Sequence, residues 1–103
     1  MPSASDLASM KRLSGEIDQA NRRIADNNKR VADENVTLAR KNQEYNRVAV
    51  QPPSGARDSQ LRSIKSAMDL CQRRNAGYAQ KSAQELSTIA RKTAEYNRYA
   101  SKP

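Results

Sequence analysis

Apolar residues recur every seven positions along the first half of the chain. One row has an apolar or aromatic residue at every repeat: Met10, Ile17, Ile24, Val31, Leu38 and Tyr45. A seven-residue repeat returns a side chain to the same helix face every two turns, which is the pattern of a coiled-coil seam. The row therefore predicts one long α-helix over residues 1–50.

The matching row in the second half is apolar at both ends and polar in the middle. Its polar members are Asn75 and Ser82, and its apolar members are Leu61, Met68, Ile89 and Tyr96. We predict that the apolar residues of the two rows form one packing stripe between two helices.

A coiled-coil seam requires a second apolar row beside the first. In the first half of the chain, both rows that could serve are polar in their centres. Four residues after the apolar row lie Asn21, Asn28, Asn35 and Asn42, and three residues after it lie Leu13, Ala20, Asn27, Glu34, Lys41 and Val48. The asparagines have two interpretations. Unpaired buried amides cost about 1–3 kcal/mol each, which favours a solvated flank. The alternative is a ladder of amides that fixes the register of a multi-helix bundle.

The chain contains two copies of one unit, 51 residues apart. Residues 38–49 read LARKNQEYNRVA and residues 89–100 read IARKTAEYNRYA, with eight of twelve positions identical. The same offset aligns Asp18 with Asp69, Arg22-Arg23 with Arg73-Arg74, Ala32 with Ala83, and Glu34 with Glu85. Such self-similarity predicts a duplicated helical unit.

Proline and glycine separate the two copies. Pro52 and Pro53 disfavour helix around Gln51, so we predict helical repeats over 1–50 and 58–103 joined by a loop over 51–57 within a single hairpin domain. Ser3 with Asp6 is expected to cap the first helix, and Asp58 or Ser54 the second. Gly77 is the expected position of any kink in the second helix.

These elements predict an all-α antiparallel helical hairpin of the coiled-coil type. Folding back about Pro53 brings residues together whose numbers sum to about 106, so Ile24 is expected to face Ser82 and Val31 to face Asn75. A helix held by one thin apolar stripe is marginally stable alone. We therefore expect self-association or docking onto a protein partner, as a homo-oligomer or within a hetero-assembly.

Composition excludes a compact globular core. Leu, Ile and Val together number 14, Phe and Trp are absent, and alanine numbers 15. No apolar stretch approaches the roughly 18 residues of a membrane span, and the start lacks a secretory signal. A soluble protein is expected, in the cytoplasm or within a virion or other large assembly.

Charge raises the question of a polyanionic partner. The net charge is +8, with +2 in residues 1–50 and +6 in residues 51–103. Basic doublets occur at Arg22-Arg23, Lys29-Arg30, Arg73-Arg74 and Arg91-Lys92. Adjacent helical residues diverge by about 100°, so the doublets are expected to spread charge around the helix instead of forming one track.

No catalytic, metal or cofactor site is expected. The chain has no histidine, one cysteine and no glycine-rich phosphate loop. Its carboxylates lie among basic residues at helical spacings, as surface ion pairs do. These absences argue against an enzyme.

The most specific short motif is the repeated Glu-Tyr-Asn-Arg at residues 44–47 and 95–98. Its tyrosines have a structural interpretation as rings that cover the stripe. They also have a functional one, because aromatic residues beside arginine are common in interfaces. The partner-binding candidates are Arg40, Lys41, Tyr45, Arg47, Arg91, Lys92, Tyr96 and Arg98.

The sequence therefore predicts a non-enzymatic structural or interaction protein, one subunit of a larger assembly of the virion, tail or secretion type. The alternative is a small basic protein that binds a nucleic-acid phosphate backbone through its second helix. A third option is an adaptor that lays its helices along a partner's groove.

Overall fold

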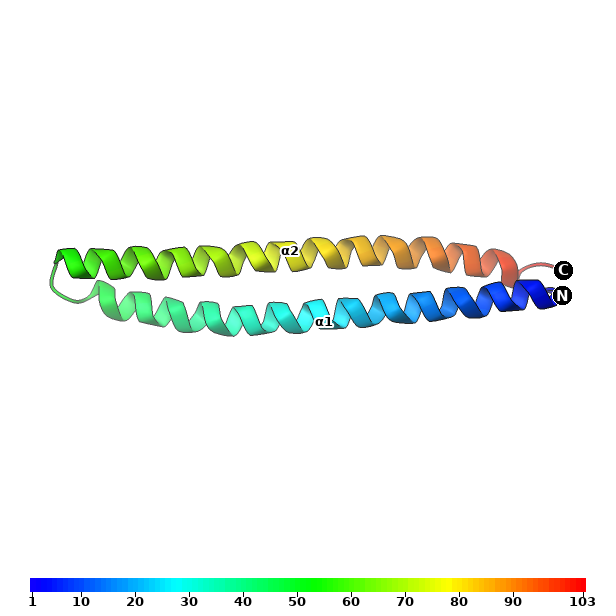
Figure 1. Cartoon of the computed structure of the whole chain (residues 1–103), viewed down its shortest axis with the longest axis horizontal. Helices are drawn as coiled ribbons and strands as arrows, with labels where there is room; N and C mark the ends of the chain where they lie inside the picture. Colours follow the sequence, from blue (N-terminus) through cyan, green and yellow to red (C-terminus); the bar gives the residue numbers. More distant parts are fainter. The chain divides into compact units, whose positions relative to one another are not determined.

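The computed structural model describes all residues, 1–103, and contains two α-helices and no strand. Helix α1 spans Ala4–Ala49 and helix α2 spans Gly55–Ala100 (Figure 1). Both the first and the last residues of the two helices are 51 positions apart, so the helices are the two copies of the repeat. The predicted all-α antiparallel hairpin is confirmed.

Both helices begin at serine caps. The Ser3 amide donates to Oδ2 of Asp6 and the Asp6 amide donates to Oγ of Ser3, each at 3.0 Å. This reciprocal pairing satisfies two amides that a helix start leaves free. At α2, Oγ of Ser54 accepts from the Arg57 amide at 3.0 Å. The second helix therefore starts at Gly55, and the predicted loop over 51–57 is too long because its last three residues are helical.

The chain divides into two compact units. Unit 1 contains Met1–Asn27 and Gln80–Pro103, and unit 2 contains Asn28–Ala79. In each unit a segment of α1 packs antiparallel against a segment of α2. Residues 1–27 of unit 1 have their repeat equivalents at 52–78, in unit 2. Residues 29–52 have theirs at 80–103, in unit 1. The repeat therefore relates each unit to the other. Each unit thus combines the first half of one repeat with the second half of the other.

The residues buried most completely lie beside the predicted stripe. They are Leu13, Ala20, Asn27 and Val48 of α1 and Ile64 and Cys71 of α2. The four from α1 belong to the row three residues after the apolar row, so this row supplies the second line of the seam. The ten stripe residues themselves, Met10 to Tyr45 and Leu61 to Tyr96, are all half-buried.

The predicted pairing, in which facing residue numbers sum to about 106, is displaced by two to four residues, because the interhelix ion pairs and hydrogen bonds join residues whose numbers sum to 108–110. Ser82 receives a hydrogen bond from Asn27 at 3.4 Å, where Ile24 was expected. Asn75 donates to Oδ1 of Asn35 at 2.9 Å, where Val31 was expected. The expected pairing matched like rows, whereas Ser82 contacts Asn27, which belongs to the second row of the seam with Leu13 and Ala20. Asn75 contacts Asn35, which belongs to the row four residues after the apolar row.

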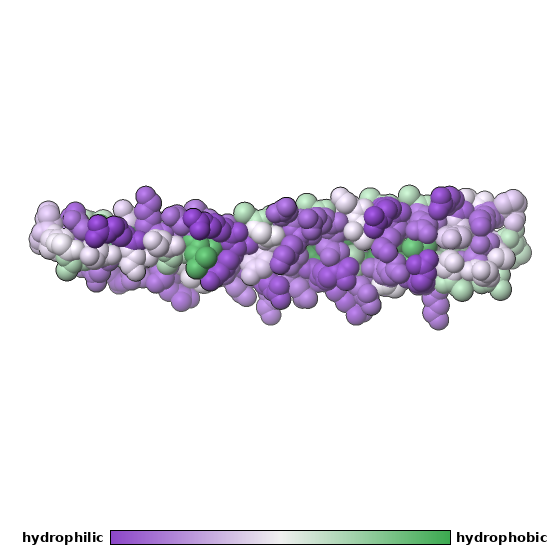
Figure 2. Space-filling model, turned by 45° about the horizontal axis from the view of Figure 1, so that its top comes forward, coloured by the Kyte–Doolittle hydropathy of each residue, from purple (hydrophilic) through white to green (hydrophobic).

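Helix α2 continues through Gly77 without interruption, and no glycine has a positive φ. Neither helix contains a stretch that is both long and apolar enough to cross a membrane. Hydrophobic side chains lie exposed among hydrophilic ones on the face that Figure 2 displays. The largest exposures in the helices are those of Val36 (59%), Leu86 (58%) and Leu7 (54%).

Candidate interaction surfaces

Ion pairs between the helices lie along one flank of the seam. In unit 1, Nε and Nη2 of Arg23 donate to the two Glu85 carboxylate oxygens at 2.7 and 3.0 Å. In unit 2, Nη1 of Arg74 donates to Glu34 at 3.3 Å. Arg74 and Glu34 are the repeat equivalents of Arg23 and Glu85. The duplicated sequence thus forms the same interhelix ion pair once in each unit.

A second type of ion pair occurs only in unit 1. The Lys92 ammonium group donates to Glu16, whose other oxygen receives Nη1 of Arg12 at 3.2 Å. The equivalent of Lys92 is Lys41, but Ala67 stands where Glu16 would be repeated. Lys41 therefore pairs within its own helix, with Glu44 at 3.4 Å.

These cations lower the pKa of the carboxyl groups that they contact. The hydrogen bond from Lys92 lowers the pKa of Glu16, and the hydrogen bond from Arg23 lowers that of Glu85. The Ser3 amide, followed by Lys102, lowers the pKa of Asp6. A carboxyl group whose pKa is lower in the folded chain stabilises the fold above its unfolded pKa. This contribution disappears as the pH falls through the folded pKa.

We therefore expect the thermal midpoint to be constant from neutral pH down to about pH 5 and to fall below the ordinary glutamate pKa of 4.5. Circular dichroism melts between pH 7 and pH 3 measure this. The double variant Glu16→Gln, Glu85→Gln should show a smaller fall over the same range. A midpoint that holds or rises toward pH 3 in the unmodified chain would contradict the assignment.

A polar layer formed by Asn27 and Ser82 interrupts the seam in unit 1. Asn27 is only 7% exposed and hydrogen-bonds to Ser82 alone. In unit 2, the Asn75 amide nitrogen donates to Asn35, while Oδ1 of Asn75 is buried without a partner. Polar side chains in a coiled-coil seam reduce stability and restrict the alignment of the helices. We therefore expect the Asn27 layer to restrict the alignment of the helices.

The partner-binding candidates separate into two groups. Tyr45 and Tyr96 are half-buried, and Lys41 and Lys92 are held in ion pairs. The arginines at the surface are Arg40, Arg47, Arg91 and Arg98, which are exposed and form no ion pair. The structure brings Arg91 and Arg98 together with Ala94 and Glu95 around one shallow hollow of about 350 Å³.

In each unit, one flank of the two helix segments carries no charge over much of its length. The predicted amide-ladder residues Asn21, Asn28, Asn35 and Asn42 lie on it and are all exposed in the single chain. Beside them, Ala25, Ala32 and Ala39 of α1 recur in α2 as Ala76, Ala83 and Ala90, all exposed. We call these residues, with Ala79 and Leu86, the uncharged face. The signal for this face in the sequence is the alanine that recurs every seven residues in both repeats, which a pattern of large apolar residues does not include.

A groove in unit 1 and a buried cysteine are the remaining features of the surface and core. A groove of about 500 Å³ in unit 1 is lined by Leu7, Met10, Lys11, Ser14, Gly15, Asp18 and Tyr96. Cys71 is buried, and the neighbouring Glu34 carboxylate raises the pKa of its thiol. A thiol with a raised pKa is a poor nucleophile. No three histidine, cysteine or acidic side chains lie together as metal ligands would.

Comparison with models of protein families, with curated proteins and with solved structures found no match to the chain. What the molecule binds must therefore be inferred from its own surfaces.

Proposed function

We propose that the chain is a non-enzymatic helical-hairpin subunit that self-associates, or docks onto a protein partner, within a larger assembly of the virion, tail or secretion type. The observation that carries this proposal is the uncharged face. Exposed helix surfaces normally bear charged side chains, and this one bears alanine, asparagine and one leucine that is 58% exposed.

The spacing of the alanines suits contact with another helix. Ala25, Ala32 and Ala39 are seven residues apart, as are their equivalents in α2, so each set lies on one helix face. Small side chains permit close approach, near the lower end of the 8–10 Å range of interaxial distances. The exposed asparagines beside them supply donors and acceptors that another helix can satisfy.

The core of the hairpin also supports the proposal. Leu13 is the only large side chain that is fully buried, and the polar layer at Asn27 interrupts the seam. Burial of apolar area is the dominant favourable term in folding. Covering the uncharged face would therefore add a large fraction to the stability of so thinly packed a hairpin.

Sedimentation equilibrium over a range of concentrations tests the proposal. We expect an apparent mass above the 11.5 kDa of one chain that rises with concentration. The variant Ala83→Glu, Ala90→Glu places two charges on the uncharged face and should shift the distribution toward single chains. A purified chain that stays monomeric and fully helical at every concentration would contradict self-association.

The matched control is Gln80→Glu, Gln84→Glu. It adds the same charge at exposed positions of the same segment of α2, outside the uncharged face. We expect it to sediment like the unmodified chain. Equal loss of assembly in both variants would show that net charge, and not this face, governs association.

A further inference from the structure

In four pairs of adjacent cations, Arg22-Arg23, Arg40-Lys41, Arg73-Arg74 and Arg91-Lys92, one member forms an ion pair and the other does not. The cations engaged in ion pairs are Arg23, Lys41, Arg74 and Lys92. Their neighbours Arg22, Arg40, Arg73 and Arg91 are exposed and form no ion pair. Adjacent side chains diverge by about 100°, so a residue facing the seam orients its neighbour outward.

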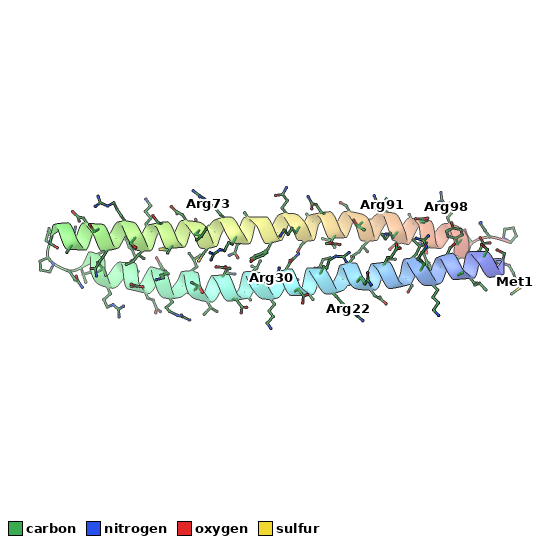
Figure 3. The ribbon with its side chains drawn as sticks, in the orientation of Figure 1. Met1, Arg22, Arg30, Arg73, Arg91 and Arg98 are labelled. Atoms are coloured by element: carbon green, nitrogen blue, oxygen red, sulfur yellow. The ribbon has the colours of Figure 1, made fainter.

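The outward-facing cations are repeated in both helices. Five exposed cations of α1 without an ion pair have an equivalent cation 51 residues later in α2. Arg30 and Lys81 are set aside because Arg30 lies over the Tyr78 ring of the partner helix. The remaining pairs are Lys11 and Arg62, Arg22 and Arg73, Arg40 and Arg91, Arg47 and Arg98. All eight are exposed and none forms an ion pair. We call them the outward cations. Figure 3 shows Arg91 and Arg98 on the side of α2 turned away from α1, and Arg22 on the opposite edge of the same unit.

The outward cations lie in aligned pairs. Arg91 and Arg98 are seven residues apart, or about two turns and 10.5 Å along α2. Lys11 and Arg22 are eleven residues apart, or about three turns and 16.5 Å along α1. Unit 2 contains the same two spacings in Arg40 with Arg47 and in Arg62 with Arg73. Because each pair lies on one helix, its two cations are held at a fixed separation. The positive charge is therefore ordered along the helix and not spread diffusely over the surface.

We propose that the outward cations bind the phosphate backbone of duplex nucleic acid. Seven of the eight are arginines, whose planar guanidinium groups match phosphate oxygens bidentately. Regularly spaced cations fit a ligand with regularly spaced anions. Nothing in the structure is arranged to enter a groove and read base edges, so the binding is independent of sequence.

The aromatic residues favour a duplex over a single strand. Proteins that bind single strands stack the bases on exposed aromatic rings. The chain has no Phe or Trp, and all four tyrosines are half-buried. Arg30 lies over the Tyr78 ring at 5.8 Å and Lys102 over the Tyr99 ring at 4.8 Å. Tyr45 and Tyr96 belong to the packing stripe, so the chain has no row of exposed rings on which bases could stack.

One carboxylate lies beside the outward cations of α2. Glu95 shares the hollow with Arg91 and Arg98 but forms an ion pair with neither. Its negative charge opposes the approach of a phosphate. Glu95→Gln is therefore expected to tighten duplex binding, which is the opposite of the effect expected for removing the arginines.

Fluorescence anisotropy with a labelled 20-base-pair DNA duplex, between about 50 and 200 mM salt, tests the proposal. We expect log K to fall linearly with log salt concentration. The variant Arg91→Gln, Arg98→Gln should bind more weakly and reduce the slope by about 1.8, since each phosphate contact contributes about 0.9. The charge-preserving variant Arg91→Lys, Arg98→Lys should retain the slope.

The control Arg23→Gln, Lys92→Gln removes the same net charge from ion-paired cations of the same unit. It should keep the slope of the unmodified chain, with helicity checked for every variant by circular dichroism. Equal loss in the control and the arginine variant would overturn the assignment of the outward cations. So would binding that is insensitive to salt, tighter binding to a single strand, or binding to phosphatidylserine vesicles but not to DNA or RNA duplexes.

Discussion

Replacing Leu13 by alanine is expected to lower the free energy of unfolding by about 2–3 kcal/mol, the largest loss from truncating any single side chain. Leu13 is 1% exposed and is the only large side chain that the hairpin buries fully. For a chain of this size, the loss corresponds to a fall of roughly 10–20 °C in the thermal midpoint. Circular dichroism melts at equal chain concentrations measure it, because association also shifts the midpoint.

Leu70→Ala is the matched control. Leu70 is 45% exposed and lies outside the uncharged face, so its truncation should change the free energy of unfolding by no more than about 0.5 kcal/mol. Similar losses for Leu13→Ala and Leu70→Ala would show that the seam does not pass through Leu13.

The double variant Asn27→Leu, Ser82→Ala is expected to raise the stability of the hairpin by about 2 kcal/mol, because it replaces the polar layer with buried apolar area. Asn27 is 7% exposed and its hydrogen bond to Ser82, at 3.4 Å, is long. The gain should be accompanied by a loss of specificity, since polar seam residues restrict alignment and oligomer number. Sedimentation velocity should then show a broader distribution of species.

Asn28→Leu provides the comparison for the polar layer. Asn28 is exposed and adjacent to Asn27, so the same substitution there should bring no comparable gain in the melting midpoint. A lower midpoint for the Asn27→Leu, Ser82→Ala variant would show that the amide stabilises the hairpin as well as aligning it.

The helices and their ends follow from local sequence signals. The seven-residue apolar period, the capping pair of Ser3 and Asp6, and the prolines after Gln51 were sufficient to predict two helices and a turn. The duplication also predicts that the two helices have equal length, and their first and last residues are indeed 51 positions apart. These signals act within a few residues, so they need no knowledge of the partner helix.

The alignment of the helices could not be predicted in the same way. It depends on which row accompanies Met10, Ile17 and Ile24 in the seam, and both candidate rows are polar in their centres. Leu13 is buried because α2 covers the row three residues after the apolar row. The local sequence of α1 does not indicate which of the two rows α2 covers. The displacement in the pairing of Ser82 and Asn75 followed from this ambiguity.

The division of the basic doublets could not be predicted either. Arg22 and Arg23 are chemically identical neighbours, and only the position of Glu85 on α2 determines which one forms an ion pair. In the second repeat the equivalent residue, Arg74, likewise forms the ion pair. Once the seam is known, the helical angle between neighbours identifies the outward member of each doublet.

The composition of the two units has a consequence for how separate chains can combine. Each unit joins half of α1 to half of α2, and every interhelix ion pair and hydrogen bond described above lies between those helices. Two chains that exchange their second helices keep all of these contacts, and only the five connecting residues, 50–54, must adopt a new conformation. The same interactions that close the hairpin would therefore also hold together a domain-swapped dimer, in which the turn would be straightened and its prolines extended.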